Sequence, residues 1–177
     1  MKKALILIGW YSKSGDNWYP WLQEEFEKKG YQVSIPNLPT MNTKLPDMQK
    51  QIDFITNNCK IDQDTVIVGH SLGAVLALRL AEKYKYRKMF LIAGWDFDDL
   101  TSEHRLFWSN KMNHTKIKKN VKGIYVVSSD NDPYTTAITA EGMNKRLGGK
   151  FILVKGAGHF TKKFGNISKI PVITNYV

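Results

Sequence analysis

The sequence predicts an α/β fold, with a mostly parallel sheet of about six strands covered by helices on both faces in three α/β/α layers. Short runs of β-branched and other apolar residues alternate along the chain with longer segments of helical periodicity. No Gly/Ser-rich linker and no internal repeat divides the 177 residues. A composition that is 42% hydrophobic and 12% aromatic is sufficient for a substantial core. We therefore expect residues 1–177 to form a single domain.

The predicted strands are the short runs at residues 4–8, 32–35, 65–68, 89–93, 124–128 and 151–154. The predicted helices are the segments at residues 18–29, 48–58, 72–84 and 136–147. Gly30 and Gly148 follow the first and last of these helices, where a left-handed residue commonly ends a helix. Strands that alternate with helices of this length form βαβ units, which produce a parallel sheet.

One segment, residues 94–120, interrupts this alternation. It contains Trp95, Phe97, Phe107 and Trp108 among several acidic residues, without a clear period. An irregular insertion after the carboxyl end of a strand usually lies over the ligand crevice of a parallel-sheet enzyme. We expect it to be a small lid or a wall of the substrate site.

Charge and composition argue against several other classes of protein. The net charge of +10 is compatible with nucleic-acid binding, but the lysines are scattered and no arginine-aromatic stripe or known binding motif accompanies them. Cys59 is the only cysteine, so neither an intrachain disulfide nor a cysteine-based zinc site is expected. No apolar run is long enough for stable membrane insertion, and we expect a cytoplasmic protein.

The segment from Thr65 to Leu78 carries the strongest chemical signal. It reads as a strand, the G-x-S-x-G sequence Gly69-His70-Ser71-Leu72-Gly73, and then a helix. This context is typical of a nucleophile elbow, a strained strand-to-helix turn that exposes a serine hydroxyl at a helix N-terminus. Ser71 is therefore the predicted nucleophile. His70 is expected to have a structural role beneath the turn.

A serine hydroxyl needs a base, and four histidines are available. His159 follows the last predicted strand on the glycine-rich loop Gly156-Ala157-Gly158-His159, and it is our candidate. His104 and His114 lie in the irregular segment and lack such a scaffold.

The orienting acid should precede this histidine, on the loop that follows the preceding strand. That loop offers Asp130 and Asp132. Asp132 is preferred because Pro133 fixes the turn behind it, whereas Asp130 is better suited to closing the turn onto its own backbone.

The backbone N–H groups of Leu72 and Trp10 are the predicted oxyanion donors, Trp10 because it lies on the loop after the first strand. Aromatic residues gather near this loop and suggest an apolar acyl or leaving-group pocket. The predicted substrate contacts are Tyr11, Trp18, Trp21 and Tyr134.

These segments resemble the small serine hydrolases of the RBBP9/YdeN family (retinoblastoma-binding protein 9-like), in the α/β-hydrolase superfamily. The resemblance runs through nearly the whole chain. Its specific parts are Gly9-Trp10 with residues 16–22, the elbow at 69–73, the turn at 128–133 and the loop at 156–160. It implies a compact α/β-hydrolase fold and the triad Ser71, Asp132 and His159. Many related hydrolases carry a histidine where this chain has Ile8.

The sequence thus predicts a metal-independent serine hydrolase that cleaves carboxylic esters, or amides, of small molecules through an acyl-enzyme and needs no cofactor. An alternative is an interaction protein that has a hydrolase scaffold and a vestigial or occluded site. No nucleic-acid partner is expected, and nothing in the sequence indicates a protein partner.

Overall fold

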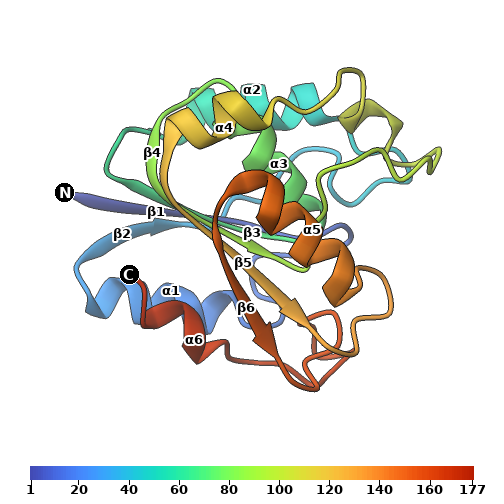
Figure 1. The fold of residues 1–177 in the computed structure, drawn as a ribbon. Coiled ribbons are helices and arrows are strands. Elements are labelled where there is room, and N and C mark those ends of the chain that lie inside the picture. Colours follow the sequence, from blue (N-terminus) through green and yellow to red (C-terminus); the bar gives the residue numbers. More distant parts are fainter.

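The computed structural model describes all residues 1–177 and shows a six-stranded sheet in the order β2-β1-β3-β4-β5-β6, in which every neighbouring pair is parallel (Figure 1). The strands are β1 (Lys2–Leu7), β2 (Tyr31–Ser34), β3 (Thr65–His70), β4 (Tyr86–Ile92), β5 (Val121–Ser129) and β6 (Lys150–Val154). All six predicted strands are confirmed, and several begin earlier than the apolar pattern indicated.

Helices cover both faces of the sheet, which confirms the three-layer prediction (Figure 1). One face carries α1 (Tyr19–Lys28) and α6 (Pro171–Thr174), and the other carries α2 (Met48–Asn58), α3 (Leu72–Ala81), α4 (His114–Asn120) and α5 (Ala137–Leu147). The apolar sequence of α3 matches its position, because all ten of its residues are buried, between the sheet on one side and α2 and α4 on the other. The core comprises 46 buried hydrophobic residues.

The segment 94–120 is not irregular throughout. Its last seven residues form α4, which connects β4 to β5, and Arg105–Phe107 form a short 3-10 helix. Asn113 caps the start of helix α4, and its side chain accepts a hydrogen bond from the Lys116 amide. Only Ile117 of this helix is buried. A single buried residue leaves no apolar period, which is why the sequence pattern did not reveal the helix.

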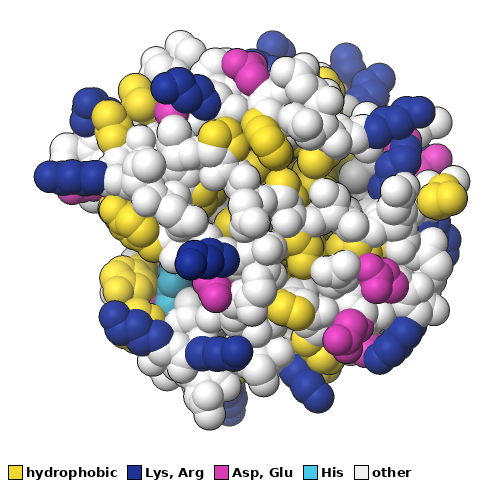
Figure 2. All heavy atoms as spheres, turned by 180° about the vertical axis from the view of Figure 1, so that it is seen from behind, with side chains coloured by type: hydrophobic (Ala, Val, Ile, Leu, Met, Phe, Trp, Pro, Cys, Tyr) yellow, Lys and Arg dark blue, Asp and Glu magenta, His cyan; other side chains and the backbone are white.

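The strand order reverses direction between β1 and β3, because the chain leaves β1 toward β2 and returns to add β3 on the other side. The loops that follow β1 and β3 therefore diverge, and open α/β sheets place their ligand crevice at this point. Figure 2 shows lysine and arginine side chains distributed around the rear face, several of them close together at the upper right, with acidic residues among them. None of the helices is both long and apolar enough to cross a bilayer.

Candidate active site

Ser71 stands on a strained turn between β3 and α3. Its φ and ψ angles are 54° and −121°, and its amide donates to the Ile92 carbonyl at 2.9 Å. Such angles are costly for a residue with a Cβ and persist only where the surroundings impose them. The turn directs the hydroxyl away from the core, to the edge where the parallel strands end.

The two glycines of the elbow are required by close backbone approach. A Cβ at Gly73 would lie 2.3 Å from the Leu7 carbonyl oxygen, and a Cβ at Gly69 would lie 2.4 Å from the Gly73 carbonyl oxygen. Neither position has space for a methyl group. The glycines allow α3 to start directly against β1, which brings Ser71 beside the loop that follows β1.

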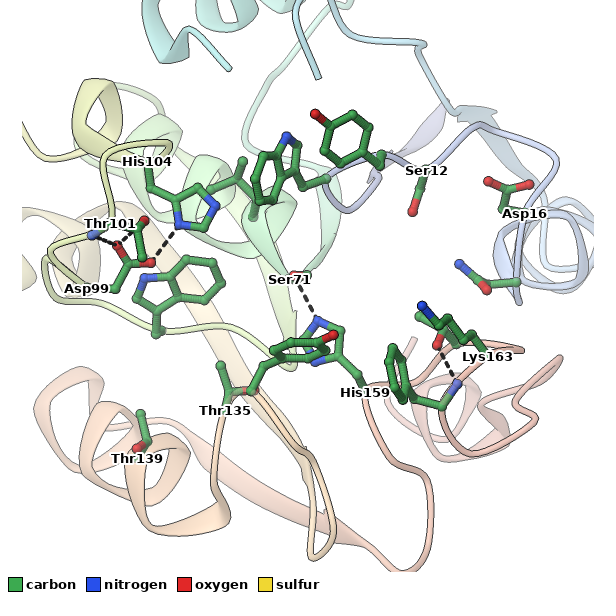
Figure 3. A pocket seen from close by; sticks show the side chains of 18 of the residues that line it. Ser12, Asp16, Ser71, Asp99, Thr101, His104, Thr135, Thr139, His159 and Lys163 are labelled. Atoms are coloured by element: carbon green, nitrogen blue, oxygen red, sulfur yellow. Dashed lines mark hydrogen bonds and ion pairs between the residues drawn. The ribbon is translucent and has the colours of Figure 1, made fainter. Parts of the chain in front are cut away.

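The structure brings the three predicted triad residues into one hydrogen-bonded chain. His159 Nε2 lies 2.9 Å from Ser71 Oγ, as the dashed line in Figure 3 shows. On the other side of the ring, His159 Nδ1 lies 2.9 and 3.0 Å from the two carboxylate oxygens of Asp132. A carboxylate in this position accepts the Nδ1 proton, so Nε2 is the nitrogen that can receive the serine proton.

Asp132 is held by donors from its own loop. The amides of Tyr134 and Thr135 donate to Oδ1 at 2.8 and 3.1 Å, and the Thr135 hydroxyl donates to Oδ2 at 2.9 Å. Burial acts to raise the pKa of Asp132, but the hydrogen bond and charge of His159, together with the two amides, outweigh it and lower the pKa. Asp132 is therefore a carboxylate poised to stabilise an imidazolium.

Residues 129–131 hold the backbone of the histidine loop, while Asp132 holds the His159 ring, and the sequence did not reveal these backbone contacts. Ser129 Oγ accepts the Ala157 amide at 2.9 Å, and Asn131 Oδ1 accepts the Gly158 amide at 2.7 Å. Asp130 was expected to close its own turn, which is wrong: its carboxylate accepts the Gly156 amide at 2.7 Å, while Asp132 caps the turn. Four consecutive residues thus fix the loop that carries His159.

The amides of Trp10 and Leu72 donate no hydrogen bond within the protein, although the neighbouring Gly9, Tyr11 and Ser71 amides all have acceptors. Trp10 and Leu72 both line the cavity in which the Ser71 hydroxyl lies. Unpaired N–H groups at such a place are available to a negatively charged oxygen. The geometry is thus consistent with the predicted oxyanion donors.

The cavity has a volume of about 730 Å³. Its aromatic walls comprise Trp10, Tyr11, Trp95, Phe97, Tyr134 and Phe164. The polar residues shown around it in Figure 3 include Asp99, Thr101, His104 and Thr139. Two predicted substrate contacts, Tyr11 and Tyr134, line this cavity, and the Tyr134 ring packs edge-on against the His159 ring with 4.9 Å between centroids. Residues 95–104 form one wall, as expected for the segment after β4.

Trp18 and Trp21 do not line the cavity, which corrects two of the predicted substrate contacts. Trp18 is fully buried, and its indole N–H donates to the Phe160 carbonyl at 3.0 Å. Trp21 is half-buried and packs against the core from α1. Both belong to the start of α1, whose inward face points into the protein and not toward the cavity.

The remaining histidines have other partners. His70 is buried below the elbow, as expected, and contacts Tyr19 and the His159 carbonyl. His104 and His114 each pair with an aspartate, Asp99 and Asp96 respectively, at 2.6 Å. His104 therefore does have a scaffold and lies in the cavity wall, which its sequence context gave no reason to expect.

Comparison with known proteins shows the family of this chain. The family model described as Serine hydrolase matches residues 4–174. The chain belongs to the serine hydrolase family. Among curated members, this serine hydrolase is 28% identical over 165 residues to Serine hydrolase RBBP9 of Rattus norvegicus, covering 89% of this chain and 87% of the relative. It is 25% identical over 179 residues to Putative hydrolase YdeN of Bacillus subtilis, covering 97% and 92%. The RBBP9/YdeN resemblance is thus confirmed.

Solved structures support the fold of this serine hydrolase. The ydeN gene product from B. subtilis superposes with a TM-score of 0.87 at 22% identity, over 99% of this chain and 96% of that one. Est1E from Butyrivibrio proteoclasticus, in a structure with bound ferulic acid, superposes with a TM-score of 0.75 at 11% identity, over 99% and 86%. The α/β-hydrolase fold is thereby established for the chain.

Proposed function

We propose that this serine hydrolase cleaves carboxylic esters, and amides more slowly, through an acyl-enzyme on Ser71. The observation that carries the proposal is the continuous chain from Asp132 through His159 to Ser71, with contacts of 2.9 Å on both sides of the imidazole. Within this hydrogen-bonded triad, Ser71 acts as the nucleophile. His159 acts first as the general base and then as the general acid, and Asp132 is the carboxylate that orients His159.

In the first step His159 Nε2 removes the proton from Ser71 Oγ while the oxygen attacks the substrate carbonyl carbon. The imidazolium that forms is stabilised by the Asp132 carboxylate. The substrate carbonyl oxygen becomes negatively charged, and the amides of Trp10 and Leu72 donate to it.

The tetrahedral intermediate then collapses. His159 gives its proton to the leaving alcohol or amine, and the acyl group remains on Ser71. A water molecule repeats the sequence: His159 deprotonates it, it attacks the acyl carbon, and the bond to Ser71 Oγ breaks with return of the proton to the serine. Esters react faster than amides in this scheme because the ester carbonyl has less resonance stabilisation than an amide, and an alcohol leaves with less complete protonation than an amine requires.

The cavity indicates a small-molecule acyl compound as the substrate. Its volume of about 730 Å³ lies within the range of drug-sized ligand sites, and its aromatic walls favour an apolar group. Tyr11 and Tyr134 both line the cavity beside Ser71 and are more than half exposed. They are the proposed substrate contacts. The loop at 95–104 completes the wall and is proposed to determine which acyl groups fit.

Hydrolysis of p-nitrophenyl esters from acetate to octanoate, by wild type and Ser71→Ala, tests this function. Wild type should turn over these esters, and Ser71→Ala should lose at least about 10³-fold in kcat. The chain length at which kcat/KM falls measures the usable depth of the cavity. Equal inactivity of both proteins across the panel would favour the alternative, an interaction protein on a hydrolase scaffold.

A further inference from the structure

A buried chain of hydrogen bonds runs beneath Ser71 and joins two loops of the site. The Gly9 amide lies 3.1 Å from Tyr19 Oη, and Tyr19 Oη lies 2.6 Å from His70 Nδ1. On the far side of the ring, His70 Nε2 lies 2.9 Å from the His159 carbonyl oxygen. Tyr19 is fully buried and His70 is 1% exposed, so water does not compete for these contacts.

The donors and acceptors of this chain follow from its two ends. The Gly9 N–H can only donate, and the His159 carbonyl can only accept. Tyr19 Oη therefore accepts from Gly9 and uses its single proton toward His70 Nδ1. His70 Nδ1 is the acceptor, and Nε2 carries the proton that it donates to His159. One neutral tautomer of His70 satisfies every partner.

Both side chains are held in the neutral form that this pattern needs. Burial, followed by the proximity of His159, lowers the pKa of His70 to about 3. Burial also raises the pKa of Tyr19, so its hydroxyl keeps the proton. A charged His70 beside His159 would oppose formation of the imidazolium, and the neutral ring avoids this repulsion.

The two ends of the chain lie next to the groups that act on the substrate. Gly9 precedes Trp10, whose unpaired amide is the proposed oxyanion donor. The His159 carbonyl belongs to the residue whose imidazole contacts Ser71. Packing is tight here as well, because a Cβ at Gly9 would lie 3.2 Å from His70 Nδ1.

We propose that Tyr19 and His70 are positioning residues that set the distance between the oxyanion amide of Trp10 and the imidazole of His159. The inference rests on the function proposed above. Neither residue touches the substrate, since neither lines the cavity. Their effect is therefore expected in kcat, where alignment matters, and not in KM, because small misalignments of reacting groups can cost about 10²-fold in rate.

The first test compares Tyr19→Phe with Tyr86→Phe. Tyr86 is a matched control: its buried hydroxyl also has a backbone partner, the Ala77 carbonyl at 2.6 Å, but neither that carbonyl nor its other partner, Met89, belongs to the chain between Gly9 and His159. We expect Tyr19→Phe to lower kcat for p-nitrophenyl butyrate by about 10- to 100-fold with KM changed less than about twofold. Tyr86→Phe should leave kcat within about twofold.

The second test asks whether a hydrogen-bond donor at position 70 is the active feature. His70→Gln retains an N–H that can reach the His159 carbonyl, whereas His70→Leu has none. We expect His70→Gln to retain at least about tenfold more kcat than His70→Leu, with both compared at matched folded fractions from circular dichroism. If His70→Leu does not fold, the comparison of Tyr19→Phe with Tyr86→Phe decides alone.

The outcomes separate the two proposals. If wild type neither hydrolyses the ester nor reacts with a fluorophosphonate, the proposed function fails and the positioning role fails with it. If wild type is active but folded Tyr19→Phe retains kcat within about twofold, only the positioning role is overturned. A loss of kcat in Tyr86→Phe as large as that in Tyr19→Phe also overturns it, because the effect would then be general destabilisation.

Discussion

His159 Nε2 lies 2.9 Å from Ser71 Oγ, although 88 residues separate the two in the chain. Each residue follows a different strand, Ser71 after β3 and His159 after β6, with β4 and β5 between them in the sheet. The contact forms because parallel strands end at one edge and the loop after β6 returns over it. Residues 129–132, at the end of β5 and in the loop that follows it, hold the loop after β6 in place.

Replacing each aspartate by asparagine should distinguish the catalytic role of Asp132 from the structural role of its neighbour Asp130. Asp132→Asn keeps the shape of the side chain but can hold His159 in the wrong tautomer, and kcat/KM should fall by about 10³- to 10⁴-fold. Asp130→Asn removes the charge but keeps a side-chain oxygen that can accept from the Gly156 amide, and it should cost less than about tenfold in kcat/KM. Steady-state ester hydrolysis measures both. Equal losses in the two variants would contradict the assignment of the orienting acid.

A methyl group at Gly73 should displace the helix that follows Ser71. Because a Cβ there meets the Leu7 carbonyl oxygen at 2.3 Å, Gly73→Ala must move α3 away from β1. We expect a loss of at least about 2 kcal/mol in the free energy of unfolding, as overpacking of a rigid contact produces, and a large loss of activity. Gly15→Ala is the control, since nothing lies within 4 Å of its Cβ. Urea unfolding that places Gly73→Ala and Gly15→Ala at the same stability would contradict this reading.

The sheet, its parallel direction and the elbow could be predicted because local patterns determine them. Strand β3 is buried at all six residues and has the apolar run Val66-Ile67-Val68 at its centre, and the glycines at 69 and 73 mark contacts that only glycine allows. Ser71, Asp132 and His159 were recognisable for a related reason: each follows a strand whose end could be located. The roles of Trp18 and Trp21 could not be predicted, because α1 determines which of its aromatic residues face inward.

Stability should depend on pH through His70. The pKa of His70 in the folded protein is about 3, below the ordinary value of 6.5, so the unfolded chain binds a proton that the folded protein excludes. Exclusion of this proton costs no stability above pH 6.5, where the unfolded chain is also neutral at His70. As the pH falls from 6.5 toward 3, the folded protein loses stability relative to the unfolded chain. Between pH 7.5 and pH 5 the loss should be about 2 kcal/mol.

The non-titrating variant His70→Gln serves as the control for this prediction. Wild type and His70→Gln share every other titrating group, so the difference between their pH dependences isolates His70. Urea unfolding at pH 7.5 and pH 5 should show a steeper loss in wild type. Parallel pH dependences would mean that His70 is not held neutral by the fold.

An ion pair between two segments should stabilise the base of the cavity wall. Asp96 is buried and accepts from Arg146 Nε at 2.7 Å and from His114 at 2.6 Å, which ties the segment after β4 to α5. Arg146→Ala leaves this carboxylate underpaired and should lower the free energy of unfolding by about 2–3 kcal/mol. The neighbouring Lys145→Ala removes only an exposed pair with Glu141 and should cost less than about 0.5 kcal/mol. Equal thermal stabilities of the two variants would exclude a structural role for the Asp96 cluster.

Other parts of the structure could not be predicted from the sequence, because no local pattern marks them. The contact between Tyr19 and His70 joins residues 51 positions apart, and neither residue type indicates the other. The pair of Asp99 and His104 is close in sequence, but it has no strand end or helix period to mark it. Helix α4 was hidden by its lysine-rich surface, and only its single buried isoleucine faces the core.

The most direct test of the catalytic account is the mass of the intact protein after incubation with a fluorophosphonate, followed by peptide mapping of the adduct. We predict one adduct per chain, located on Ser71 and absent from Ser71→Ala, with labelling slowed strongly in His159→Ala. An unmodified wild-type protein, or an adduct on any other residue that persists in Ser71→Ala, would contradict the assignment of Ser71 as the nucleophile.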